Sequence, residues 1–443
     1  MLSIEDNKLL TEVGPGTPMG ALLRRYWQPV AAAADLAGSR FRTRQVKILG
    51  EDLVVYRDRS GTLGMVAANC MHRRANLSYG IVEEDGIRCV YHGWKFDATG
   101  RCLEQPYEDT THPEDNYRDK CSILAYPVQE LAGLIWAYMG PAPAPLLPRW
   151  APLVSEDSVR DIGVVELPCS WLQCQENTLD PVHTEWLHQY GGDYYRSLLK
   201  DEEPKLGHEP QHVKVGFDVF EHGIIKRRMT KGQTEDSDPW KIGHPMLFPN
   251  ILLSGNPLQN QMQFRVPVDD THTLHFTVHT FRAAPGSKAP EQETVPARRI
   301  ELYDADGNFK DLGVFFQQDY LVWVNQGAIA RRNLEKLGES DKGVILFRKQ
   351  LIEQVQRVMN GQEPTMNLFR DAAANQCIDL PIEAFRYRPP VNGVGTSATV
   401  LPGLRTPLSR YVPTEPGRSA DADKIEAVMK TWESLAEKAS VSV

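Results

Sequence analysis

The chain has 443 residues, of which 24% are charged and 41% hydrophobic, and its formal net charge is −9. At roughly 100–200 residues per domain, this length predicts two domains, each with a core of its own. The acidic balance and the lack of a lysine- or arginine-rich run argue against a nucleic-acid-binding protein. Seven cysteines are an odd number, which argues against a disulfide framework.

The first residues, MLSIEDNKLLTEV, lack the basic and apolar regions of a signal peptide. No apolar run approaches the roughly 18–20 residues of a membrane-spanning helix. We therefore expect a cytoplasmic protein without a membrane partner. In that reducing compartment, cysteines are more often metal ligands or core residues than bridges.

The N-terminal segment, 1–26, has a helix-like apolar pattern that is broken by Gly-Pro-Gly at 14–16. From 27 to 145, short and partly alternating segments separated by turn signals predict an all-β domain. The proline-dense stretch PAPAPLLPRWAPL at 141–153 predicts a stiff, extended linker and the best domain boundary.

The second domain, 146–443, mixes helical and strand-like segments and therefore predicts an α+β fold around an antiparallel sheet. The strand-like segments run from about 212 to 282. Helical patterns occupy 171–190, 311–335 and 344–358, and a Pro-, Gly- and Ser-rich tail beyond 386 closes with the helix-like ADKIEAVMKTWESLAEKA.

Two cysteine–histidine pairs stand close together in the β domain. Cys70 and His72 form C-x-H, and after sixteen residues Cys89 and His92 form C-x-x-H. A structural zinc site is the rival interpretation, but zinc fingers place two cysteines first and two histidines second. One sulfur and one nitrogen from each loop suit a [2Fe–2S] cluster with both thiolates on one iron and both imidazoles on the other. Neutral histidines would raise the potential of such a cluster above that of an all-cysteine one.

The pattern C-x-H…C-x-x-H-G-W resembles the Rieske domain. Together with QENTLDPVHTEWLHQY at 175–190, it makes the chain similar to the alpha (oxygenase) component of Rieske non-haem iron oxygenases. PMGALLRRYWQPV, GEDLVVYRD and CVYHGWKFDATG resemble the phthalate dioxygenase type, which includes aromatic O-demethylases. The resemblance implies a Rieske domain at 27–145 and a helix-grip-like catalytic domain at 146–443. Met71 stands where the family usually has proline, which leaves the ligands unchanged and puts the rigidity of the loop in question.

Oxygen activation needs a redox metal with open positions, which two histidines and one carboxylate on one face of Fe(II) provide. His183 and His188 supply the two nitrogens. On an ideal helix, residues five apart are about 140° apart, so we predict a π-type distortion or a helix end between them. The resemblance places the third ligand at Asp319, with Asp304 and Asp311 as competitors nearby.

In relatives with N-x₂-D-x₂-H-x₄-H, the aspartate bridges a mononuclear-iron histidine to a Rieske histidine of the neighbouring subunit. The resemblance therefore implies that Asp180 joins His183 to His92 of the partner subunit. A homotrimer, or a stack of trimers, is then part of the mechanism. Asn177 falls where family members keep a polar side chain beside the iron, and its alternative role is a helix N-cap.

The chain has no G-x-G-x-x-G fingerprint, so NAD(P)H can act only through a separate reductase of flavin/iron–sulfur type, with or without a ferredoxin. We expect that partner to dock near Trp94 and the exposed edge of the histidine ligands. With O₂ as co-substrate, the resemblance implies oxidation of an aromatic carboxylic acid, whose carboxylate Arg228, Arg265 or Arg282 would bind.

Several alternatives stay open from the sequence. The reaction is either O-demethylation of a methoxy-aryl acid or ring hydroxylation of a phthalate-like acid, and placement of the substrate decides between them. A Rieske electron-transfer protein without oxygenase chemistry would need only about the first 150 residues. A zinc-stabilised binding protein would be colourless and redox-silent.

Overall fold

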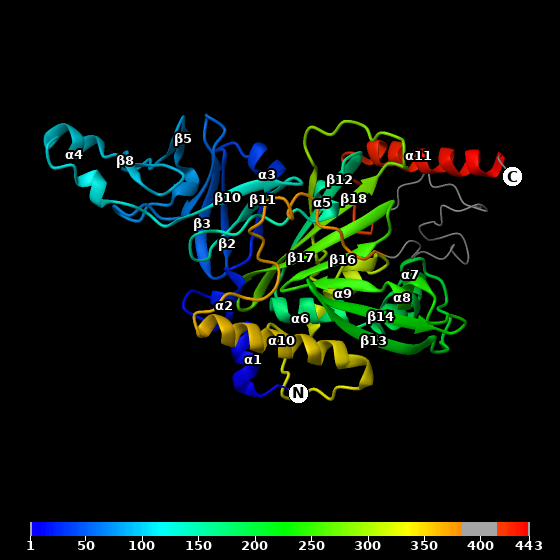
Figure 1. The fold of residues 1–443 in the computed structure, drawn as a ribbon. Coiled ribbons are helices and arrows are strands. Elements are labelled where there is room, and N and C mark those ends of the chain that lie inside the picture. Colours follow the sequence, from blue (N-terminus) through cyan, green and yellow to red (C-terminus); the bar gives the residue numbers. More distant parts are fainter. Residues whose placement is uncertain (1, 383–413, 442–443) are drawn as a thin grey trace.

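The computed structural model describes residues 2–382 and 414–441. A narrow β-rich part from the first third of the chain projects from a larger part, in which helices pack against a long sheet (Figure 1). The expected α+β architecture, an all-β part followed by helices around a central antiparallel sheet, is confirmed. Among the described residues, no helix is long and apolar enough to cross a membrane.

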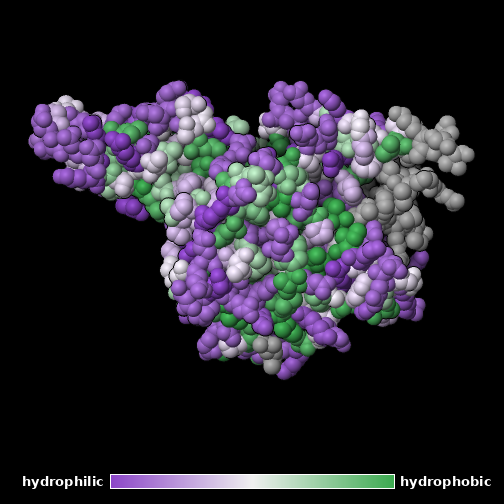
Figure 2. Space-filling view, viewed as in Figure 1, coloured by the Kyte–Doolittle hydropathy of each residue, from purple (hydrophilic) through white to green (hydrophobic). Residues whose placement is uncertain are grey.

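The projecting part contains three small antiparallel sheets, ordered β2-β3-β4-β9, β5-β6-β7-β8 and β1-β11-β10. Its surface is mostly hydrophilic, whereas hydrophobic side chains gather over the large sheet of the other part (Figure 2). Its elements are β1 (Gln28–Ala32), α3 (Ala33–Ala37), β2 (Thr43–Ile48), β3 (Glu51–Arg57), β4 (Leu63–Ala67), β5 (Ile81–Glu83), β6 (Gly86–Arg88), β7 (Lys95–Phe96), β8 (Cys102–Glu104), α4 (Pro106–Thr111), β9 (Ala125–Tyr126), β10 (Val128–Leu131) and β11 (Leu134–Ala137).

Eight strands form the large sheet, in the order β13-β14-β15-β16-β17-β18-β12-β19. Only β12 and β19 pair in parallel in this sheet as described. Its central strands are buried over almost their whole length, because the projecting part packs against one face, where Trp136 contacts Phe264, and α9 packs against the other, where Trp323 contacts His275. The strands are β12 (Ser158–Leu167), β13 (His212–Phe220), β14 (Gly223–Thr230), β15 (His244–Leu247), β16 (Ile251–Gly255), β17 (Gln259–Asp269), β18 (His272–Arg282) and β19 (Ala297–Arg299).

The helices of the larger part come from both ends of the chain. The predicted N-terminal helices form on either side of the Gly-Pro-Gly break, and the Trp171 indole N–H donates to the Leu10 carbonyl at 3.2 Å. The helices are α1 (Ile4–Thr11), α2 (Pro18–Leu23), α5 (Ala151–Val154), α6 (Trp171–Glu176), α7 (Gly192–Leu199), α8 (Asp238–Lys241), α9 (Phe315–Asn325), α10 (Lys342–Met359) and α11 (Ala422–Val441), with a π-helix, η4, at Thr184–Gly191.

Two expectations about the chain need correction, and a third can be checked only for part of its residues. The helix predicted over 311–335 is only α9, because Gly327 adopts a left-handed φ of 91° just after its end. The stretch 141–153 is not a free extended linker: its last residues belong to α5, its backbone bonds to residues 369 and 378, and Trp150 is buried. Most of the tail beyond 386 lies outside the described residues, but the predicted closing helix is confirmed as α11.

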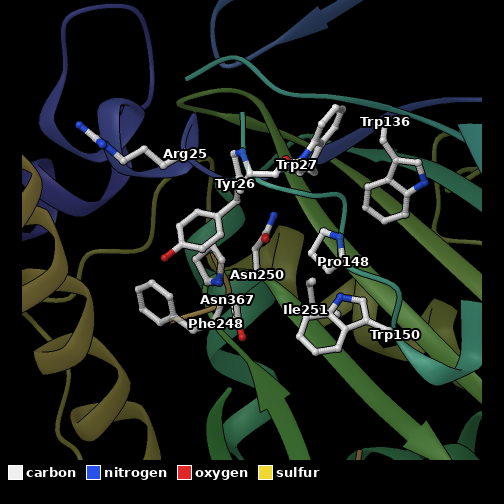
Figure 3. Close-up of a pocket in the computed structure, with 12 residues that line it drawn as sticks. Arg25, Tyr26, Trp27, Trp136, Pro148, Trp150, Phe248, Asn250, Ile251 and Asn367 are labelled. Atoms are coloured by element: carbon white, nitrogen blue, oxygen red, sulfur yellow. Dashed lines mark hydrogen bonds between the residues drawn. The ribbon is translucent and has the colours of Figure 1, made fainter. Parts of the chain in front are cut away.

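A small cavity of about 20 Å³ lies where the projecting part meets the larger one (Figure 3). Aromatic rings from both parts surround it, and the Trp27 indole donates to the Pro145 carbonyl at 2.9 Å. The volume holds about one water molecule, so the cavity does not admit an aromatic substrate. The cavity lies in the apolar interface that joins the two parts.

Helix α6 is anchored to the residues around α10 by a buried ion network. The Glu176 carboxylate accepts from Arg332 at 2.9–3.0 Å and from Arg348 at 2.6 Å. Both guanidinium groups are almost fully buried. Burial opposes ionisation of Glu176, but the two arginines hold its pKa below the usual value. The network therefore holds α6 in place. It also fixes the start of the segment 177–191, which directly follows this helix.

We expect Glu176→Gln to lower the free energy of unfolding by about 3–5 kcal/mol, because it leaves the buried Arg332 without its carboxylate and removes one of the two carboxylates that Arg348 contacts, the other being Glu335. Urea denaturation followed by circular dichroism measures this loss. The matched control is Glu353→Gln on the exposed face of α10, where Glu353 pairs with Lys349 at 3.8 Å. That change should cost less than about 0.5 kcal/mol.

The same pair of proteins should show a pH dependence. Because the folded-state pKa of Glu176 is depressed, its contribution is present above the unfolded pKa of about 4.3 and is lost as the pH falls below it. The stability gap between the wild type and Glu176→Gln should therefore narrow under acid conditions. A gap that widens below about pH 4 would contradict this assignment.

Candidate active site

Two loops at the end of the projecting part carry the cysteine–histidine pairs. Cys70 and Cys89 are buried, whereas the imidazoles of His72 and His92 are exposed, with ring centroids 4.5 Å apart. Burial and the neighbouring Cys89 thiol raise the pKa of Cys70 to about 11. Two adjacent thiols inside and two imidazoles outside fit a binuclear cluster that has one sulfur-bound iron and one nitrogen-bound iron.

The two loops close with the same hydrogen bonds. The Arg74 N–H donates to the Cys70 carbonyl, and the Gly93 N–H donates to the Cys89 carbonyl, at 3.0 Å in both loops. Both donors follow their cysteine by four residues and have left-handed φ values, 61° for Arg74 and 79° for Gly93. Backbone turns therefore hold the first loop in shape although Met71 replaces the usual proline.

The exposed surface of this part combines large apolar and aromatic side chains with the basic Arg73 and Arg74 of the first loop, and Arg73 lies 5.3 Å from the Tyr91 ring. The large side chains are Met71, Val90, Tyr91, Tyr107 and Tyr117. Trp94 is only 7% exposed, because its ring stacks on His72 at 4.6 Å. The expected docking face therefore presents the histidine edges and these apolar side chains, while Trp94 supports His72 from behind.

A second constellation lies between the π-helix η4 and α9. The donor atoms of His183, His188 and Asp319 all lie within 4.8 Å of one another. Asp319 Oδ1 is 3.3 Å from His188 Nε2 and 3.8 Å from His183 Nε2. Within the described part of the chain, both Asp319 Oδ1 and His188 Nε2 are buried without a hydrogen-bond partner. These unsatisfied, converging atoms fit a two-histidine, one-carboxylate metal site.

The protonation of the two imidazoles follows from their outer contacts. His183 Nδ1 lies 2.5 Å from the Asp180 carbonyl, and His188 Nδ1 lies 3.0 Å from Gln318 Oε1. Carbonyl oxygens only accept, so each Nδ1 carries the proton and each Nε2 keeps its lone pair. Burial lowers the pKa of His183 to about 3, which keeps that ring neutral. Burial opposes a charge on Asp319, but the two histidines and Arg265 lower its pKa.

The predicted helix distortion is confirmed, because Thr184–Gly191 is a π-helix with His183 at its N-cap. Bonds that span five residues bring side chains five apart toward one face of the helix. Glu185, which the sequence did not reveal as important, anchors this helix. Its buried carboxylate accepts from His208 at 2.7 Å, from His212 at 2.6 Å and from two backbone N–H groups. Burial opposes its charge, but these bonds lower the pKa of Glu185 to about 2.

Asp180 contacts His183 differently from the expectation. Its Oδ1 accepts from the backbone of Val182 and His183, and its Oδ2 is 3.7 Å from the His183 ring nitrogen. The expected side-chain hydrogen bond is absent, because the Asp180 backbone carbonyl takes that N–H. About a third of the carboxylate side chain is exposed and open to another molecule. Asn177 ends α6 and begins a 3-10 turn, so it is not an N-cap.

The three predicted arginines have different surroundings. Arg265 is buried and its Nη2 donates to Gln263 at 2.7 Å. Arg228 is half-buried and donates to Thr184 on the π-helix at 3.1 Å. The prediction for Arg282 is wrong, because strand alternation buries Phe281 and leaves Arg282 exposed at the end of β18.

Asp304 and Asp311, the competitors for the third ligand, are both exposed and outside the cluster of donor atoms. The Asp304 carboxylate accepts from the backbone of Asp306 and Asn308 in a turn. Gln318, which orients His188, was also missed. Its only sequence signal is its place next to Asp319.

Comparison with known proteins agrees with this geometry. Residues 26–125 match the model of the Rieske [2Fe-2S] domain, and residues 298–376 match the model described as LigXa C-terminal domain like. The chain is 42% identical to the 5,5'-dehydrodivanillate O-demethylase oxygenase subunit of a Sphingobium strain, over 86% of this chain and 87% of that protein. It is 31% identical to the phthalate 4,5-dioxygenase oxygenase subunit of Pseudomonas putida, over 82% and 88%.

Solved structures show the same fold at low identity. NdmA of Pseudomonas putida CBB5 with theobromine matches with a TM-score of 0.57 at 20% identity, over 80% of this chain and 94% of that one. The oxygenase of carbazole 1,9a-dioxygenase, solved with its ferredoxin, matches with a TM-score of 0.52 at 18% identity, over 81% and 95%.

The chain belongs to the oxygenase (alpha) subunits of the Rieske non-haem iron oxygenases, and it is an enzyme. Members of this family use a Rieske [2Fe–2S] cluster, a mononuclear iron and O₂. The alternative of an electron-transfer protein without oxygenase chemistry is not favoured, because the match to oxygenase subunits extends far beyond the Rieske domain.

Replacing Asp319 tests the metal assignment. We expect Asp319→Ala to lower the iron content from about three to about two atoms per chain, with the cluster absorption spectrum unchanged. Elemental analysis beside the visible spectrum measures both. The control is Asp311→Ala, which removes an exposed carboxylate from the same region. Equal iron content in the two variants would show that Asp319 is not a ligand.

Proposed function

We propose that this oxygenase removes a methyl group from a methoxylated aromatic acid. In this proposal His183, His188 and Asp319 hold the mononuclear iron, and Cys70, His72, Cys89 and His92 hold the cluster. The observation that carries it is the convergence of three donors, of which two are buried and unsatisfied and the third is partly buried, in a chain 42% identical to an O-demethylase oxygenase subunit. When bound, the iron supplies the site at which O₂ is reduced with electrons from the cluster.

The protein's own residues prepare this site in three ways. The Asp180 carbonyl and Gln318 hold the outer protons of the two imidazoles and aim their lone pairs inward. Asp319 supplies the single negative charge. Glu185 fixes the π-helix that brings both histidines to one side. The same side chains keep the ligands buried, so a bound cation has few competing waters.

Electron delivery in this proposal passes between subunits. The small sheet β5–β8 lies toward the outer end of the projecting part and α9 lies within the larger part (Figure 1), so the two metal sites of one subunit are far apart. The partly exposed Asp180 carboxylate would meet the partner subunit's His92. A homotrimer or a stack of trimers provides that contact.

A separate reductase, directly or through a ferredoxin, would dock at the exposed edge around His72 and His92. None of the seven cysteines forms a disulfide, which suits the cytoplasm, where we place the enzyme. In demethylation, one atom of O₂ is inserted into a methyl C–H bond. The other atom takes up two electrons and two protons and is released as water. The resulting hemiacetal breaks down to a phenol and formaldehyde.

The direct test uses the purified enzyme with a surrogate reductase, NADH and 5,5'-dehydrodivanillate. We expect formaldehyde and the corresponding phenol in equal amounts, coupled to O₂ uptake. Mass spectrometry and a formaldehyde assay measure both, and enzyme without substrate is the control. Formation of a ring-dihydroxylated product instead, as in the dioxygenase relatives, would replace demethylation with ring hydroxylation.

Asp180→Asn tests the route between subunits. We expect both metals to be retained while single-turnover oxidation of the cluster slows by at least about a hundredfold, because the neutral amide would weaken the contact with the partner subunit's His92, whereas the Asp180 backbone carbonyl still holds His183. Stopped-flow absorbance of the reduced cluster measures this rate. Asp193→Asn on α7 is the control, since that exposed carboxylate pairs only with Arg196 among the described residues. Equal rates of cluster oxidation in the two variants would show that Asp180 does not connect the two subunits.

A further inference from the structure

The small sheet β5–β8, near the outer end of the projecting part (Figure 1), carries one charged side chain from each of its four strands. We call these four residues the charge ladder: Glu83 on β5, Arg88 on β6, Lys95 on β7 and Glu104 on β8. Their chain neighbours Val82, Ile87 and Phe96 pack into the core on the opposite face of the sheet. The ladder therefore lies on the face that is turned away from this core.

Ion pairs join the ladder across all four strands. The Glu83 carboxylate accepts from Arg88 Nε at 2.6 Å and from Arg88 Nη2 at 2.9 Å, and the same Nη2 donates to Glu104 at 2.6 Å. The Lys95 ammonium lies 3.2 Å from Glu83, 3.3 Å from Glu104 and 2.5 Å from Asp85, which is in the turn after β5. With Asp85 included, three carboxylates face two cations.

The central groups of the ladder keep their charges at neutral pH. Hydrogen bonds from Arg88 lower the pKa of Glu83 to about 2. Burial opposes a charge on Lys95, but the three carboxylates around it raise its pKa overall. The Lys95 side chain is only 7% exposed, so water and salt screen its charge less than they screen a charge on the surface.

The ladder is bonded directly to one of the two cluster loops. Strands β6 and β7 are connected by residues 89–94, the loop that carries Cys89 and His92. Arg88, which directly precedes Cys89, donates from its Nη1 to the Gly93 carbonyl at 2.7 Å. The Gly93 N–H in turn donates to the Cys89 carbonyl at 3.0 Å, and the Cys89 N–H donates to the Trp94 carbonyl at 2.8 Å. The guanidinium therefore closes the base of the ligand loop.

We propose that the charge ladder sets the reduction potential of the cluster, with Arg88 raising this potential and Glu104 lowering it. Reduction adds one electron to the cluster, so a nearby positive charge stabilises the reduced form and a nearby negative charge destabilises it. The potential in turn determines which donor proteins can reduce the cluster and how strongly the cluster reduces the iron. This inference rests on the proposed function only for the four cluster ligands and is independent of the substrate.

Arg88→Gln and Glu104→Gln each remove one charge and keep a polar side chain. We expect Arg88→Gln to lower the equilibrium constant for reduction of the cluster by about threefold to tenfold, and Glu104→Gln to raise it by a similar factor. For one electron, a tenfold change is a shift of about 59 mV. The double variant removes one charge of each sign, so its potential should return close to that of the wild type. Arg88→Lys keeps the charge and should keep most of the potential.

A redox titration of the intact holoenzyme, followed by the EPR signal of the reduced cluster, measures the potential. The visible spectrum shows in each variant that the cluster is retained. The matched controls are Arg57→Gln and Glu130→Gln, which break a partly exposed ion pair between β3 and β10, on two other sheets of the same part. Both controls should leave the potential of the cluster unchanged.

The direction of the shifts separates an effect of charge from a loosened loop. Shifts of the same sign in Arg88→Gln and Glu104→Gln, no shift in either, or a double variant as displaced as Arg88→Gln would each overturn the inference. If Arg88→Gln does not assemble the cluster, Glu104→Gln carries the test, and an unchanged or lowered potential in that variant overturns it. A wild type without a Rieske spectrum would instead refute the cluster ligands of the proposed function.

Discussion

A buried carboxylate that faces two neutral imidazole nitrogens is the arrangement on which the catalytic part depends. Asp319 Oδ1 and His188 Nε2 lie 3.3 Å apart, and neither has a hydrogen bond among the described residues. Two lone pairs facing each other in a buried site repel unless a proton or a cation lies between them. Since the outer nitrogens already carry the protons, the inner side is suited to a metal and not to an acid–base pair.

Much of the surrounding structure holds these donors in place. Glu176 ties α6 to two buried arginines, and Glu185 ties the π-helix to His208 and His212. Both carboxylates are buried and keep depressed pKa values because several donors reach each of them. The two anchors hold α6 and the π-helix that follows it, and His183 and His188 lie on either side of Glu185 in the sequence.

The ligands of the two redox sites differ in how far they are exposed to solvent. The cluster loops bury sulfur and expose nitrogen, which leaves the imidazole edges open to a partner protein. Of the proposed iron ligands, His188 and Asp319 are buried and His183 is partly buried, and the Asp180 carboxylate beside His183 is about one third exposed. Exposed imidazole edges suit electrons that arrive from a partner protein, and a buried site suits an oxidation from which water is excluded.

Local sequence patterns were sufficient to predict those ligand residues that lie close to each other in the chain. The spacing of Cys70, His72, Cys89 and His92 indicated the cluster, and the five-residue spacing of the later histidines indicated a distorted helix, because chain geometry limits what close residues can reach. The resemblance supplied Asp319. Only the tertiary structure decided which distant side chains meet: Gln318 on His188, Glu185 between two histidines, and the inward Arg265 against the outward Arg282. These contacts depend on strand register and helix packing over long separations, which no local pattern encodes.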